Sequence, residues 1–223
     1  MDETSPASQS GIGKLILVPA IITLGITILR LVGELQGWTQ ILFGRGAGGG
    51  GSILGISWLP LILGPYFAVK LARSERGPAG LGRAIGLAVA GLVVFFLASY
   101  LAFATTLAIP IRMTAGFALM IVAAVITVMG WPALGRTLGA YGYAARIPVV
   151  IIMYFAIRGS WGTHYDALPP EYTGPSAALL RWFFIGVLPQ FIFWVAYTVV
   201  VGALLGTIAA AVVHRKRPPV LAA

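Results

Sequence analysis

The feature that most constrains this chain is a set of apolar runs long enough to cross a lipid bilayer. The longest extends from Ala177 to Val213, 37 residues with Arg181 as the only charge. A helix needs about 20 apolar residues to span about 30 Å of hydrocarbon. Inside a bilayer the backbone has no water partner, so spanning segments are helices or strands of closed barrels. Because the runs do not alternate between apolar and polar residues, barrel strands are excluded. We therefore expect an all-α, polytopic helical membrane protein.

The composition agrees with this class and limits the partners. The chain is 59% hydrophobic and only 9% charged, whereas a soluble domain carries about 25% charged residues. The net charge of +9 comes from basic residues that flank the apolar runs, as membrane topology requires, so the lipid bilayer is expected as a partner and nucleic acid is not. Arginine outnumbers lysine twelve to three, which is typical of a GC-rich bacterial genome. We expect the inner (cytoplasmic) membrane of a bacterium.

We expect about six spans in a single transmembrane domain, residues 14–213. They cover residues 15–36, 53–72, 84–109, 114–134, 139–161 and 190–213. A short cytoplasmic tail, residues 1–13, precedes the domain, and a basic cytoplasmic tail, residues 214–223, follows it. The final apolar run is too long for one crossing. We therefore expect Pro189 to divide it into an interfacial helix, residues 176–188, and the last span.

The distribution of basic residues predicts the orientation. With six spans, the side that holds both termini would carry Lys14, Lys70, Arg73, Arg76, Arg83, Arg136, Arg146, Arg215, Lys216 and Arg217. The other side would carry only Arg45, Arg112, Arg158 and Arg181. Because cytoplasmic loops are enriched in Lys and Arg, we expect both termini in the cytoplasm. The loop from Arg158 to Ser176 is then extracytoplasmic.

A polar stripe marks the first span. Thr23, Thr27, Arg30 and Glu34 are separated by four, three and four residues, so they lie on one helix face. A charge that faces lipid is costly, so this face should turn toward other helices or a watery cavity. The stripe is interpreted either as a polar path or ligand counter-charge, or as a structural ion pair with threonines that bond their own helix. We favour the structural pair.

The fifth span has only eleven uncharged residues between Arg146 and Arg158. Two interpretations are open for Arg146. Both arginines could extend toward the membrane interfaces and so lengthen the span, or Arg146 could be buried and functional. We favour the first.

The extracytoplasmic loop carries the remaining candidates for chemistry. They are His164, Tyr165, Asp166, Glu171 and Tyr172. One imidazole and two carboxylates are possible metal ligands, but the spacing is irregular and further ligands are missing nearby. We expect local hydrogen bonds, with the tyrosines at the membrane surface. We assign no catalytic residue and no metal site, and the sequence does not identify a cofactor.

A ridge of small residues runs along the last span. Its members are Thr198, Gly202, Gly206 and Ala210, and they include a G-x-x-x-G motif. Such ridges allow helices to approach closely in membranes. We expect this ridge to pack against another helix.

Three function classes fit these observations. The first is a non-catalytic subunit or scaffold that packs with other membrane proteins or with a second copy of the chain. The second is a transporter or channel for a small solute or ion, which would use the polar stripe. The third is an interfacial enzyme that would use His164, Asp166 and Glu171. We rank them in this order, the first slightly above the second.

Overall fold

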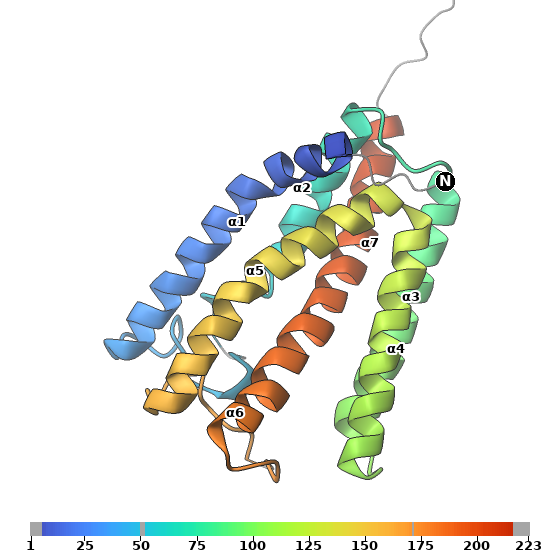
Figure 1. Ribbon diagram of the computed structural model, residues 1–223. Helices are drawn as coiled ribbons and strands as arrows, with labels where there is room; N and C mark the ends of the chain where they lie inside the picture. The colour runs from blue at the N-terminus through green and yellow to red at the C-terminus, as the bar shows by residue number, and fades with distance from the viewer. Residues whose placement is uncertain (1–5, 50–51, 171, 216–223) are drawn as a thin grey trace, which may run out of the picture. The chain divides into compact units, whose positions relative to one another are not determined.

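The computed structural model describes residues 6–49, 52–170 and 172–215. All regular secondary structure in these ranges is helical (Figure 1), which confirms the all-α prediction. The longer helices are α1 (Pro6–Leu35), α2 (Leu59–Arg73), α3 (Leu81–Ala104), α4 (Ile109–Gly130), α5 (Pro132–Gly159) and α7 (Trp194–Arg215). The shorter ones are η1 (Ala47–Gly49), α6 (Ala178–Arg181), η2 (Trp182–Val187) and η3 (Pro189–Phe193).

Five helical segments of the described chain are long and apolar enough to cross a membrane. They are Gly11–Leu35, Leu81–Ala104, Ile109–Gly130, Pro132–Gly159 and Ala178–Val213. The prediction of six spans is therefore confirmed only in part. The missing one is α2, which has 15 residues and a length of about 22 Å.

Helix α2 is shorter than predicted because it starts at Leu59 rather than near residue 53. Residues 52–58 form bends and turns instead. This segment contains Ser52, Gly55 and Ser57, which are weak helix formers. Pro60 then occupies the first turn of α2, where its missing N–H costs nothing.

The predicted break at Pro189 is wrong. The chain stays helical from Ala178 to Val213, and Leu188 has ordinary helical angles of φ −61° and ψ −52°. Proline has no N–H to donate to the preceding turn. On both sides of it the helix widens into π turns, in which Leu188 N–H donates to Phe183 O and Trp194 N–H to Pro189 O. The π turns accommodate the proline, so the helix continues without a break.

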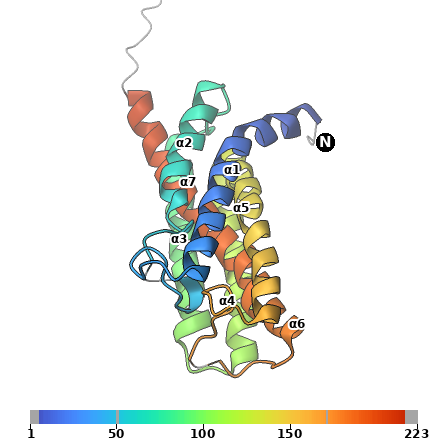
Figure 2. The ribbon, with the colours of Figure 1, turned by 90° about the vertical axis from the view of Figure 1, so that its left-hand side faces the viewer.

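The chain folds into two compact units. The first consists of Met1–Trp58 and Tyr141–Val195, and the second of Leu59–Ala140 and Ala196–Ala223. Helices α5 and α7 therefore contribute to both. Within the first unit, α1 runs beside the second part of α5 in both views (Figures 1 and 2), and Thr23 of α1 bonds Tyr141 there. Within the second unit, α3 and α4 form an antiparallel pair (Figure 1).

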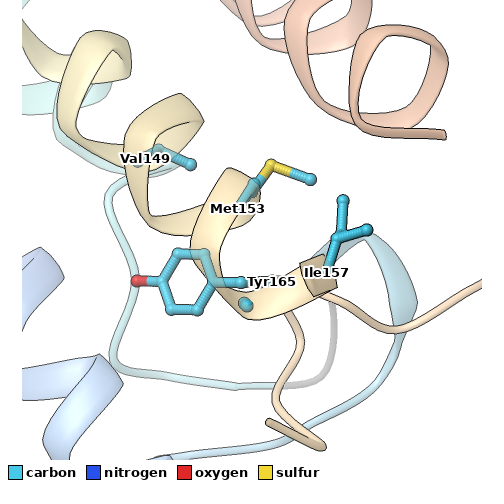
Figure 3. Close-up of a cluster of buried hydrophobic side chains, with 5 residues drawn as sticks. Val149, Met153, Ile157 and Tyr165 are labelled. Atoms are coloured by element: carbon cyan, nitrogen blue, oxygen red, sulfur yellow. The ribbon is translucent and has the colours of Figure 1, made fainter. Parts of the chain in front are cut away.

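The core of the first unit covers the end of α5. Figure 3 shows Val149, Met153 and Ile157 on one face of this helix, with the Tyr165 ring from the following loop against them. Ala156 completes the buried cluster. The loop after α5 is thus part of the core.

The ridge of small residues on α7 lies against α2 and the first turns of α5 in the second unit. A Cβ built on Gly202 would lie 2.7 Å from Leu138 Cδ2, and one on Gly206 would lie 2.8 Å from Gly64 O. Thr198 and Ala210, the other two members, are buried as well. The opposing residue on α2 is Gly64, whose added Cβ would collide with the backbone of Gly202. Helices α2 and α7 therefore meet backbone to backbone.

This contact predicts that Gly64→Ala destabilises the protein. The new methyl group would collide with the backbone of Gly202, which cannot move aside as a flexible side chain can. Overpacking of this kind costs about 1–3 kcal/mol. Gly25→Ala in α1 is the matched control, because Gly25 is exposed and nothing lies within 4 Å of its added Cβ. The melting temperature in detergent should fall for Gly64→Ala and stay level or rise for Gly25→Ala. Equal melting temperatures would contradict the backbone contact.

Candidate functional site: a buried carboxylate that joins three segments

The candidate site begins where α1 ends. Gly37 has a φ of +69°, which favours glycine. Its N–H donates to Glu34 O over 3.2 Å, and the next residue, Trp38, donates to Gly33 O over 2.9 Å. This is the Schellman arrangement that closes a helix C-terminus. It leaves Glu34 in the last turn of α1, beside the loops that follow α1 and α5.

The Glu34 side chain accepts hydrogen bonds from two segments far apart in the sequence. Arg30 Nε, one turn earlier on α1, donates to Oε1 over 2.8 Å. The backbone N–H of His164 donates to Oε2 over 2.8 Å, and His164 Nδ1 lies 2.6 Å from Oε1. The Glu34 carboxylate is fully buried and the Arg30 side chain is only 7% exposed. Both carboxylate oxygens are therefore satisfied inside the protein.

The glycine-rich segment after α1 joins the same cluster. Arg30 Nη2 donates to Gly44 O over 3.1 Å, and the neighbouring Arg45 donates to the backbone oxygen of Glu34. We call Arg30, Glu34, Arg45 and His164 the Glu34 cluster. It connects α1, the segment that follows α1 and the loop that follows α5.

The loop of residues 160–175 is shaped so that His164 reaches Glu34. At its start, Ser160 has a φ of +49°. Trp161 N–H donates to Ala156 O over 3.3 Å, and this bond closes the C-terminus of α5. Asp166 then accepts bonds from Gly162 N at 2.9 Å and from both Thr163 N and Thr163 Oγ1 at 2.7 Å. Asp166 thereby stabilises the turn that contains His164 and Tyr165.

Tyr165 follows His164 and fills the space between α1 and α5. In Figure 3 its ring lies against the α5 cluster, and its hydroxyl points away from that cluster. The hydroxyl donates to Thr27 O over 3.2 Å. One turn earlier on α1, Thr23 Oγ1 lies 2.8 Å from Tyr141 Oη on α5. The polar stripe of α1 therefore faces α5 and the 160–175 loop.

The two threonines of the stripe also bond their own helix. Thr23 Oγ1 lies 2.8 Å from Pro19 O, and Thr27 Oγ1 donates to Thr23 O over 2.9 Å. Pro19 lies inside α1, and its carbonyl oxygen accepts the bond. Such back-bonding to the preceding turn is the usual way in which a helical threonine satisfies its hydroxyl.

The two buried charges of the cluster balance when His164 is neutral, because Arg45 is exposed. Buried Arg30 carries one positive charge and buried Glu34 one negative charge, so a positive charge on His164 would be in excess. Burial lowers the pKa of His164 below its ordinary value, more than its hydrogen bond to Glu34 raises it. Arg30 lowers the pKa of His164 further. Neutral His164 therefore donates from Nδ1 to Glu34, and Nε2 is its unprotonated ring nitrogen.

The candidate residues of the 160–175 loop differ in their contacts and burial. Asp166 makes local hydrogen bonds, as predicted, and Tyr172 Oη donates to Pro175 O over 3.0 Å. Tyr165 is only 2% exposed, so the prediction that it lies at a surface is wrong: its apolar ring completes the α5 core. His164 bonds α1 rather than its own loop. Glu171 lies outside the described residues.

The favoured interpretation of Arg146 is also wrong. This residue is 5% exposed and does not extend to an interface. Its Nη1 donates to Gln190 Oε1 over 3.2 Å, and its guanidinium lies 4.6 Å from the ring centre of Trp194. Arg146 is buried, as the alternative interpretation stated, and the aromatic face and the amide compensate its desolvation. A function for Arg146 stays a prediction.

Sequence reasoning did not select three residues that take part in these contacts: Tyr141, which bonds Thr23, Arg45, which bonds Glu34 O, and Gln190, which bonds Arg146. For Tyr141 and Gln190 there was one signal, because each is polar and lies in an expected span, where an unpaired polar group is costly. Arg45 lies in the loop between two expected spans. The sequence did not reveal which partners would satisfy them.

In the described ranges, no three His, Asp or Glu side chains gather where they could hold a metal ion. The chemistry that the site offers is proton exchange at His164 and strong, charge-assisted hydrogen bonding around Glu34. Comparison with protein-family models, with curated protein sequences and with solved structures gave no match.

We predict that the Arg30–Glu34 pair is essential for stability. Arg30→Leu and Glu34→Leu should each cost about 3–5 kcal/mol, because a single change leaves the other charge buried and alone. The double variant should recover part of this loss. The recovery should be incomplete, since His164 also loses its acceptor. Melting temperature and folded yield in detergent measure the effect.

Arg158→Leu provides the control for that series. It removes the same charge at an exposed position at the end of α5, where Nη1 bonds Tyr154 Oη over 2.7 Å. Exposed interactions contribute less than about 1 kcal/mol. If Arg30→Leu is no more damaging than Arg158→Leu, the buried pair does not support the fold.

Proposed function

We propose that this chain is an integral protein of a bacterial cytoplasmic membrane, with six crossings and both termini in the cytoplasm. The outer helix faces support a lipid environment. Leu17 and Ile21 on α1 are 57% and 59% exposed, and Phe96 and Leu97 on α3 are 63% and 61% exposed. Contiguous apolar surface of this kind is costly in water. Helix α2 supplies the second crossing together with the non-helical residues 52–58.

Within this setting, we propose that the protein is a non-catalytic subunit or scaffold. One observation carries the proposal: the acid and base groups of the candidate site are used in internal bonds. Both Glu34 oxygens have partners, Asp166 holds its own turn, and His164 Nδ1 is bonded to Glu34. A catalytic site needs such groups within reach of a substrate. Here they fix the structure instead.

The surface of α3 supplies a place for a partner helix. Gly82, Gly86 and Ala90 recur every four residues and are exposed. Nothing lies within 4 Å of a Cβ added at either glycine. A smooth ridge of this kind permits close contact between helices in a membrane. The partner is another membrane protein or a second copy of the chain.

The assembly is tested with Gly86→Leu. A leucine at this position obstructs a partner helix but meets nothing within the chain itself. Val89→Leu, on an exposed position of the same helix, is the matched control. We expect the parent and Val89→Leu to migrate as a complex in mild detergent and Gly86→Leu to migrate as the single chain. A parent chain that is already single, or a Gly86→Leu complex of unchanged mass, contradicts the proposal.

The topology is tested with single cysteines, since the parent chain has none. Intact cells that carry Ser5→Cys, Ser160→Cys or Ala222→Cys are treated with an impermeant thiol reagent. Six crossings predict labelling at residue 160 alone. If α2 does not cross, residue 222 is labelled and residue 160 is protected.

Transport of a small solute or ion is a second candidate, and the surroundings of Arg146 favour it. This buried cation bonds Gln190, which lies in a π turn. Ionisable groups within spans often mark a pathway, and π turns are frequent at functional sites. Proton or solute flux into proteoliposomes that Arg146→Gln abolishes would support transport over the scaffold role.

A further inference from the structure

In the described part of the 160–175 loop, two neighbouring residues bond α1. His164 donates from its backbone N–H to the Glu34 carboxylate, and its Nδ1 bonds the same carboxylate. Tyr165 donates to Thr27 O. A change at the Glu34 carboxylate therefore affects both His164 bonds, and a change at the imidazole affects the Nδ1 bond directly.

We propose that His164 and Glu34 form an acid-sensitive latch, which holds the 160–175 loop on α1 at neutral pH and releases it when His164 takes up a proton.

The charges around His164 explain why a proton would open the latch. On α1 it faces Arg30 and Glu34, and Arg45 of the following segment bonds the Glu34 backbone. On its own loop the nearby acid is Asp166, which is bonded to Gly162 and Thr163. A proton on His164 leaves the buried side chains of the cluster with excess positive charge. The side chain of His164 is only 13% exposed, so water compensates little of it.

Helix α5 contributes Arg146, a second buried cation of the same unit, which faces Gln190 and Trp194. Among the described residues of this unit, Glu34 is the one buried carboxylate, whereas buried cations lie on both α1 and α5. Glu171, the other acid of the loop, lies outside the described residues.

The direction of the pH effect follows from the protonation of His164. Burial lowers the pKa of His164 in the closed loop, whereas an open, hydrated loop returns it to an ordinary value of about 6.5. The open form therefore binds the proton more tightly. The closed form is fully favoured above about pH 6.5 and loses stability as the pH falls below that value.

Opening of the latch would uncover the α5 face beneath the loop. Ala156 is fully buried and belongs to the cluster that the Tyr165 ring covers (Figure 3). Release of Tyr165 exposes this position and the Thr27 carbonyl of α1. This face of α5 would be exposed only at acidic pH.

The latch is tested by the reactivity of Ala156→Cys in the full chain in detergent. The probe is 4,4′-dithiodipyridine, and rates are divided by those of Ser160→Cys, an exposed position in the same loop. From pH 7.5 to pH 5 we expect the normalised rate to rise at least tenfold. With His164→Gln added, the rate should change less than twofold, because a glutamine amide still donates to Glu34 but takes up no proton.

Two outcomes overturn the proposal. One is a normalised rate in Ala156→Cys that is the same at both pH values. The other is an equal rise with and without His164→Gln, which would place the titrating group elsewhere. If Ala156→Cys does not fold, hydrogen exchange of residues 160–170 in the otherwise unchanged chain replaces it. After correction for the intrinsic rate, acid should speed this exchange about tenfold in the parent and not in His164→Gln.

Discussion

The first unit of this protein depends on the burial of one carboxylate. An ion without partners is costly to bury, yet Glu34 has no exposed surface. Arg30 neutralises its charge and His164 supplies two further hydrogen bonds. In return, Glu34 fixes α1, the segment after it and the 160–175 loop in one arrangement. Desolvation offsets much of the attraction in the complete cluster, so its importance lies mainly in the cost of leaving one of its charges buried without a partner.

The second unit uses a different physical principle. Its helices approach through small residues, with Gly64 against Gly202 and Gly91 against Thr127. Close backbone contact gains dispersion energy over a long surface. The first unit is thus specified by polar bonds and the second by shape. The same small-residue chemistry is exposed on α3 at Gly82 and Gly86, and it is there that we propose an external partner.

Much of the secondary structure could be predicted from the apolar runs, because hydrophobic length and helix length are linked in a bilayer. The exceptions have local causes. The start of α2 was predicted too early, since the run from residue 53 is apolar but contains weak helix formers. Pro189 was expected to break its helix, but π turns absorbed it. Apolar composition does not distinguish a helix from a turn, nor an α turn from a π turn.

The sequence by itself determined the Arg30–Glu34 pair, because residues four apart on a helix are neighbours whatever surrounds them. It also indicated that this face turns inward, since a charge is costly in lipid. Only the tertiary structure decided that His164 would bond Glu34 across 130 residues, that Tyr165 would enter the core, and that Arg146 would be buried. Helix periodicity is a local property. The position of a loop depends on the distant groups with which its residues can form hydrogen bonds.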